Sequence, residues 1–132
     1  MATARFTGNI EGWDENTITE IDSGGKLTQA NVKQSFSGDL EGEGSVQWLM
    51  CYRADDTAEF VGMQRVVGRI GGRSGSFVML QTEGTFDGKL AKGKLTIVPG
   101  SGTNELAGLS GEGEFNAPMG GEPTAQLEYE VG

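Results

Sequence analysis

Glycine recurs through almost the whole chain, so that nearly every window of eleven residues contains one. A glycine in a helix interior costs about 1 kcal/mol relative to alanine, and the sequence therefore offers few segments that would form a stable helix. The glycines are interleaved with apolar and β-branched runs instead of clustering in one tract. This spacing favours strands with bulges and bends over a flexible linker, and it predicts an all-β chain.

Period-two alternation of apolar and polar residues supports this prediction, because it is the pattern of a half-buried strand. Six segments alternate in this way, at residues 6–11, 27–40, 45–53, 59–71, 76–86 and 125–131. The residues expected to face the interior are Phe6, Gly8, Ile10, Ala30, Val32, Phe36, Leu40, Val46, Trp48, Met50, Tyr52, Phe60, Gly62, Gln64, Val66, Gly68, Ile70, Val78, Leu80, Thr82, Gly84, Phe86, Ala125, Leu127, Tyr129 and Val131.

Short turn sequences at 23–25, 53–56, 71–75 and 87–88 fit antiparallel connections between these segments. A sheet with one apolar face has to close on itself or pack on a second sheet, because otherwise its edges stay open. We therefore predict one all-β domain over residues 1–132, a closed antiparallel barrel of about eight strands in a mostly meander order. At most one helical turn is expected, near 103–107 and capped by Thr103. A two-sheet sandwich is the alternative that the sequence leaves open.

Composition excludes several classes of function. The chain carries 19 acidic and 10 basic side chains, and a net charge of −9 argues against a nucleic-acid partner. No apolar run is long enough to span a membrane as a helix, and the first residues lack the apolar core of a signal peptide. Cys51 is the single cysteine, which fits a reducing compartment, and we expect the protein to be cytoplasmic. The absence of histidine rules out histidine-bound metals and histidine-dependent catalysis, and we expect neither a metal nor a cofactor.

The residues expected inside the barrel mix aromatic surface with a few uncharged hydrogen-bonding groups. Seven of them are the candidate ligand-binding residues: Trp48, Met50, Tyr52, Gln64, Leu80, Thr82 and Tyr129. A core filled by its own side chains would explain the aromatic residues but would require partners for every buried amide, hydroxyl and phenol. A cavity for a small apolar or aromatic molecule would explain both kinds of residue, and the sequence leaves these two interpretations open.

Three motifs occur in order along the chain, at 36–44 (FSGDLEGEG), 72–78 (GRSGSFV) and 98–109 (VPGSGTNELAGL). They resemble a bacterial family catalogued as domain of unknown function 3224. The resemblance implies a β-barrel similar to that of allene oxide cyclase and related in shape to calycin-like barrels, whose members hold hydrophobic small molecules and in some cases guide an isomerisation or cyclisation. It also implies a glutamate where Gln64 stands and a histidine where Thr82 stands, so this chain lacks that acid/base pair.

Three hypotheses for function follow. The first is a barrel that binds a small apolar or aromatic metabolite, the second is a cofactor-free isomerase or cyclase that uses the same cavity, and the third is a filled scaffold or interaction module. Apolar residues on the outward faces also predict a homo-oligomer, since such a patch in a soluble protein commonly contacts another subunit. These residues are Leu49, Cys51, Val61, Met63 and Val67.

Overall fold

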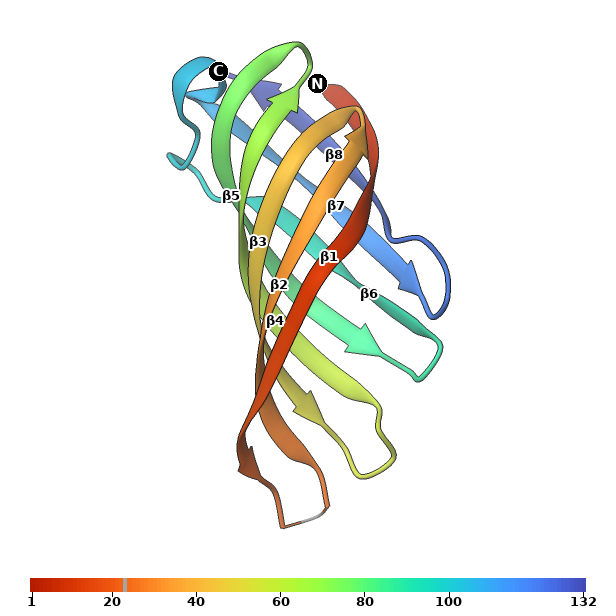
Figure 1. Cartoon of the computed structure of the whole chain (residues 1–132). Helices are drawn as coiled ribbons and strands as arrows, with labels where there is room; N and C mark the ends of the chain where they lie inside the picture. Colours follow the sequence, from red (N-terminus) through yellow and green to blue (C-terminus); the bar gives the residue numbers. More distant parts are fainter. Residues whose placement is uncertain (23) are drawn as a thin grey trace.

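The computed structural model describes residues 1–22 and 24–132 and forms a closed barrel of eight antiparallel strands (Figure 1). Each strand pairs with the next one along the chain, and β8 pairs with β1 to close the barrel. The strands are β1 (Ala2–Glu20), β2 (Lys26–Gly38), β3 (Leu40–Tyr52), β4 (Ala58–Ile70), β5 (Arg73–Phe86), β6 (Leu90–Ile97), β7 (Leu109–Pro118) and β8 (Thr124–Val131). The predicted meander barrel is confirmed. Of the expected turns, that at 23–25 includes Ser23, which lies outside the described residues.

The two ends of the barrel differ. Because successive strands are antiparallel, the β1–β2, β3–β4, β5–β6 and β7–β8 hairpins gather at one end, and both termini lie at the other (Figure 1). β1 has 19 residues whereas β6 and β8 have 8 each, so the wall built from the long strands extends beyond the opposite wall at the hairpin end. The barrel is therefore flared at the hairpin end, and the inner face of the long strands is open there.

The terminal end is plugged by the connection between β6 and β7. This connection contains a single 3-10 turn, η1 (Asn104–Leu106), which confirms the expected helical turn, and the side chain of Leu106 is fully buried. The expected cap is wrong, because the Thr103 side chain makes no capping bond to the turn. Its Oγ1 instead accepts a hydrogen bond from the backbone N–H of Ser76 in β5, at 3.0 Å. Thr103 thus fastens the plug to the barrel wall.

Buried side chains form two clusters along the barrel axis. The first core cluster fills the terminal end and consists of Ala4, Phe6, Phe36, Leu40, Val66, Ile70, Phe77, Met79, Leu95, Ile97, Leu106, Leu109 and Leu127. The second core cluster lies toward the hairpins and consists of Ala30, Val32, Val46, Met50 and Phe60, with Trp48, Tyr52, Ala91 and Phe115 packed against it. Only the terminal end is packed solid, so the space toward the hairpins depends on how the second cluster is arranged.

A β-bulge in β5 changes which residues face inward. The register passes from Gly62 opposite Gln81 to Phe60 opposite Gly84, so that one residue of β4 faces two residues of β5, and Glu83 adopts a positive φ of 53°. One extra residue moves every side chain on one side of the bulge to the other face of the sheet. The result is that Phe77, Met79 and Gln81 are the buried residues of the first part of β5.

The predicted sidedness of this part of β5 is therefore wrong. Leu80 lies opposite Met63, which is exposed, and Thr82 lies opposite Lys94, which is also exposed. Residues directly opposite each other share a face of the sheet, so Leu80 and Thr82 belong to the outer surface, and Val78 has the same parity. Beyond the bulge the original expectation holds, since Gly84 is buried and Phe86 lines the interior.

Glycines on the inner face make room for aromatic rings of neighbouring strands. A Cβ placed on Gly62 would overlap the Trp48 ring, and one placed on Gly84 would lie 2.6 Å from ring carbons of Phe60. Gly44 and Phe36 form a third such pair. The rings can therefore lie across the strands instead of standing toward the barrel axis, which leaves space along that axis.

The outer face of the long strands carries a group of apolar residues, most of which adjoin one another. Leu49 of β3 lies opposite Val61 of β4, and Met63 of β4 lies opposite Leu80 of β5. Leu49, Val61 and Met63 are 55%, 49% and 57% exposed. Together with Val67, which is also exposed, these residues are called the outer apolar patch below: Leu49, Val61, Met63, Val67 and Leu80.

Candidate functional site

A cavity of about 790 Å³ occupies the barrel between the first core cluster and the hairpin end. Residues of all eight strands line it, together with residues 119–123 of the β7–β8 loop. Small-molecule pockets usually measure roughly 300–1,000 Å³, so the space is sufficient for a molecule of several rings. The barrel is thus not filled by its own side chains toward the hairpins, although the second core cluster lies there.

Four aromatic rings form a continuous wall of the cavity. Trp13 packs on Trp48 with ring centroids 5.5 Å apart, Trp48 meets Phe60 nearly edge-on at 5.6 Å, and Phe60 lies 6.2 Å from Phe115. The four residues come from β1, β3, β4 and β7, and the rings therefore connect opposite sides of the barrel. Aromatic side chains combine a large contact area with little loss of conformational freedom, which suits them to holding a planar or aliphatic guest.

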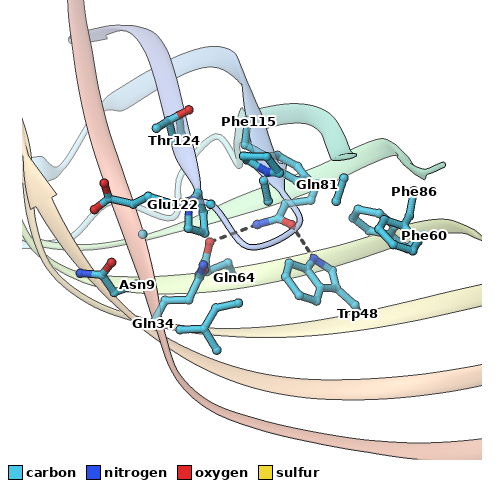
Figure 2. A pocket seen from close by; sticks show the side chains of 18 of the residues that line it. Asn9, Gln34, Trp48, Phe60, Gln64, Gln81, Phe86, Phe115, Glu122 and Thr124 are labelled. Carbon is cyan, nitrogen blue, oxygen red and sulfur yellow. Dashed lines mark hydrogen bonds between the residues drawn. The ribbon is translucent and has the colours of Figure 1, made fainter. Parts of the chain in front are cut away.

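Three glutamines cross the cavity wall in a single chain of hydrogen bonds (Figure 2). Trp48 Nε1 donates to Gln81 Oε1 at 2.5 Å, Gln81 Nε2 donates to Gln64 Oε1 at 3.1 Å, and Gln64 Nε2 donates to Gln34 Oε1 at 2.6 Å. Gln64 and Gln81 are only 1% and 4% exposed, so each amide needs these partners. The chain supplies three of the polar side chains of a mostly apolar site, and the others that line the cavity are Asn9, Tyr52, Glu122 and Thr124.

The β7–β8 loop forms part of the cavity mouth. Ala117 and Pro118 are the last residues of β7. Beyond them the backbone N–H of Met119 donates to the carbonyl oxygen of Lys89 at 2.7 Å, and the N–H of Gly8 donates to that of Pro123 at 3.0 Å. The loop is thus bonded to the β5–β6 turn on one side and to β1 on the other.

A carboxylate lies on the open inner face beside the cavity. Glu15 of β1 accepts hydrogen bonds from Trp13 Nε1 at 3.0 Å and from Thr28 Oγ1 at 2.7 Å. Burial of the Tyr52 phenol, together with the negative charge of Glu15 nearby, raises the pKa of Tyr52 to about 12. On the same face Lys26 Nζ lies 5.4 Å from the centre of the Tyr52 ring. Tyr52 is consequently neutral and a hydrogen-bond donor throughout the physiological pH range.

Comparison with known proteins gives a family for this barrel. The family model described as "Protein of unknown function (DUF3224)" matches residues 2–129. The chain belongs to the DUF3224 family. A solved crystal structure of a DUF3224 protein of unknown function from Shewanella oneidensis MR-1 is 25% identical, covers 100% of this chain and 98% of its own, and superimposes with a TM-score of 0.84. No curated protein matches the chain.

Four of the seven candidate residues line the cavity of this DUF3224 protein, namely Trp48, Met50, Tyr52 and Gln64. Leu80 and Thr82 lie on the outer surface because of the β5 bulge, so the position at which the resemblance implied a histidine does not face Gln64. Tyr129 faces inward but packs against the first core cluster, and its hydroxyl lies beside Gly71 in the β4–β5 turn. It belongs to the plugged end and not to the cavity.

Several cavity residues of this DUF3224 chain are not among the seven candidates. Phe60 was expected to face the interior but was not counted as ligand-binding, and Gln34 has the same parity as Val32 and Phe36, so the alternation alone was sufficient to find both. Trp13 follows a register shift between Ile10 and Gly12, and Gln81 precedes the β5 bulge; in both strands a single irregularity reversed the faces. Phe115 comes from β7, which lies outside the six segments that alternate.

Among residues 1–22 and 24–132 of this DUF3224 chain, no helix is long and apolar enough to cross a membrane.

Proposed function

We propose that the protein binds a small apolar or aromatic molecule inside the hairpin end of the barrel. The observation that carries this proposal is the cavity of about 790 Å³ lined by Trp13, Trp48, Phe60 and Phe115 and crossed by the glutamine chain. Apolar walls with a few convergent polar groups are the usual composition of a ligand site, because the walls provide affinity and the polar groups fix orientation.

The packed terminal end and the inner-face glycines explain how an open cavity is compatible with a stable barrel. The first core cluster buries the large apolar side chains of the terminal end, and the strands then continue past it toward the hairpins. Inner-face glycines let rings such as that of Trp48 lie across the wall, as at Gly62. The fold is thus stabilised at one end while the other end retains space for a guest.

The polar groups at the centre of the cavity favour binding over acid–base catalysis. Gln34, Gln64 and Gln81 are amides, which hold hydrogen bonds but exchange no proton near neutral pH. The Tyr52 phenol, with a pKa near 12, stays protonated under the same conditions. A reaction that used only these groups would have to depend on holding a flexible substrate in a reactive shape. No observation in the structure favours that second candidate.

The direct test is to identify what the purified protein carries. Protein purified without detergent is denatured, and the small molecules released are compared by mass spectrometry with those from the same amount of an unrelated protein. In parallel, the uncharged dye Nile red is titrated into the protein and its fluorescence is followed. We expect a blue-shifted, saturable signal with one dye per chain.

A pair of variants on one strand separates binding in the cavity from binding on the surface. Ala91 of β6 lines the cavity, whereas Thr96 on the same strand is exposed on the outer face. Ala91→Trp fills the cavity and should weaken Nile red binding at least tenfold, while Thr96→Trp adds the same ring outside and should leave binding unchanged. Equal binding by both variants would show that the dye is not in the barrel. Ala117→Trp at the rim is the second filling variant if Ala91→Trp does not fold.

A further inference from the structure

In each hydrogen bond of the glutamine chain, Trp48 determines which amide atom donates and which accepts. The indole nitrogen of Trp48 can only donate a hydrogen bond, so the atom of Gln81 that faces it must be the amide oxygen. The amide nitrogen of Gln81 then faces Gln64 and requires an oxygen there, and Gln64 in turn presents its nitrogen to Oε1 of Gln34. The orientation of all three amides therefore follows from a single donor-only group.

The direction of the chain decides which atom ends it. Gln34 uses its amide oxygen to accept from Gln64, and its Nε2 lies against Gly8 of β1, where a Cβ would be 3.2 Å away. Nε2 of Gln34 donates no side-chain hydrogen bond to any residue in the described part of the chain, and Gln34 lines the cavity. The chain thus presents N–H donors, not acceptors, where it ends in the cavity.

The charges around the cavity restrict the ligand further. Among the described residues, those that line the cavity include no lysine or arginine, and the ionisable group at the mouth is the carboxylate of Glu122. Glu15 adds a second carboxylate on the flared inner face beside Tyr52, where Lys26 Nζ over the Tyr52 ring is a nearby cation. Farther inside, at Gln34 and the Trp48 and Phe60 rings, an anionic group would lose its hydration with no lysine or arginine among the lining residues to pair with it, which is strongly unfavourable.

We infer that the ligand is uncharged and carries a hydrogen-bond acceptor, such as a ketone or ester carbonyl, that meets Nε2 of Gln34 while its apolar body lies against the Trp48 and Phe60 rings. This inference rests on the proposed function and specifies its ligand class. Carboxylates whose charged group would have to lie at Gln34 are excluded as good ligands, although their apolar parts would fit the walls of the cavity.

Three probes of the same shape test this inference. 2-Acetylnaphthalene is neutral and has a carbonyl, 2-isopropenylnaphthalene replaces that oxygen by a methylene group, and 2-naphthoate carries a negative charge. Each probe competes with Nile red on the wild-type protein, on Gln34→Met and on Gln126→Met, which makes the same substitution on the exposed face of β8. Methionine retains the length of glutamine but has no donor.

In the wild-type protein the ketone should bind about three- to tenfold more tightly than the alkene, as expected for one hydrogen bond, and at least tenfold more tightly than the carboxylate. Gln34→Met should make the ketone and alkene equal, whereas Gln126→Met should not. Equal affinities of ketone and alkene in the wild-type protein, or a preference for naphthoate, would overturn the inference and leave the proposed function standing. Failure of Nile red and both neutral probes to bind would contradict the proposed function itself. The wild-type comparison decides the question even if Gln34→Met does not fold.

Discussion

Nε1 of Trp48 lies 2.5 Å from Oε1 of Gln81, and this hydrogen bond joins the aromatic wall of the cavity to its polar wall. The two residues are 33 positions apart in the sequence and lie on β3 and β5, with β4 between them. The bond spans the intervening strand because Gly62 of β4 has no side chain where the indole ring passes. Positioning of the ring and satisfaction of the amide therefore depend on the same glycine.

The first prediction contrasts Gln81 with its neighbour Thr82. Gln81→Met leaves the Trp48 N–H and the Gln64 amide oxygen without partners in a buried site, and should lower the free energy of unfolding by about 1–3 kcal/mol. Thr82→Val changes an outer-face position and should alter it by less than about 0.5 kcal/mol. Urea unfolding followed by circular dichroism measures both. A larger loss for Thr82→Val than for Gln81→Met would mean that Thr82, and not Gln81, faces the interior.

Gln81 and Thr82 also show which part of the structure could not be predicted from the sequence. The alternation predicted the inward faces of β3 and β4 correctly. These two strands pair with each other over their whole length, Leu40–Tyr52 with Ala58–Ile70, without a bulge between them. In β5 the same pattern failed, since the backbone gains one residue at Glu83. Glutamate rarely adopts a positive φ, and no turn sequence at Glu83 indicated a bulge.

The closed barrel and the DUF3224 family, in contrast to the inward face of β5, were predictable from the sequence. Regular strands at hairpin spacing allow few architectures, and three ordered motifs cover positions from Phe36 to Leu109. The cavity was not predictable in the same way, because its volume depends on how far rings such as Phe60 tilt over glycines of the next strand. Hydrogen bonds between Gln34, Gln64 and Gln81 likewise depend on three-dimensional register.

The second prediction concerns the space that Gly62 provides. A Cβ at this position would overlap the Trp48 ring and the backbone oxygen of Gln47, so Gly62→Ala has to displace the ring and should destabilise the protein by about 1–3 kcal/mol. Gly12→Ala is the control, because nothing lies within 4 Å of a Cβ there. That change should be neutral or stabilising by up to about 1 kcal/mol. Tryptophan emission should shift in Gly62→Ala alone, and unchanged stability would contradict the close packing.

The third prediction is a delayed ionisation of Tyr52. In a Tyr129→Phe background Tyr52 is the remaining tyrosine, and its phenolate is followed by ultraviolet absorbance as the pH rises. With a pKa near 12 instead of 10.0, about one-tenth of Tyr52 should be ionised at pH 11, where an unperturbed tyrosine is about nine-tenths ionised. Glu15→Gln removes the nearby negative charge and should move the transition to lower pH.

The same shift has a consequence for stability. The folded state holds the phenolic proton more tightly than the unfolded state, so between the unfolded pKa of 10.0 and the folded value near 12 the unfolded chain binds fewer protons. Stability from this group is complete below pH 10 and declines as the pH rises above it. Urea midpoints at pH 9 and pH 11 should fall less for Tyr52→Phe than for the wild-type protein. An identical decline would show that Tyr52 ionises normally.

The fourth prediction assigns a second copy of the chain to the outer apolar patch. Along the outer face of β4, Glu59 precedes Val61 and Met63, and Arg65 follows them. Consider a two-fold axis that lies parallel to the sheet, runs perpendicular to β4 and passes over Gly62. It would place Glu59 of each copy opposite Arg65 of the other copy, with the apolar side chains between these two pairs. In such a dimer Glu59, which already pairs with Arg53 of its own chain, would gain Arg65 of the second copy as a further partner. The contact would then be complementary in charge as well as apolar, which suits a symmetric dimer.

Light scattering coupled to size-exclusion chromatography tests this assignment directly. The wild-type protein should elute with twice the mass of the 13.9 kDa chain at micromolar concentration. Met63→Glu places a charge in the centre of the patch and should give the monomer, and Arg65→Glu should weaken the dimer because it sets two like charges against each other. Lys92→Glu, on the exposed face of β6, reverses the same kind of charge away from the patch and should leave the mass unchanged. A wild-type protein that remains a monomer at all concentrations would exclude the dimer.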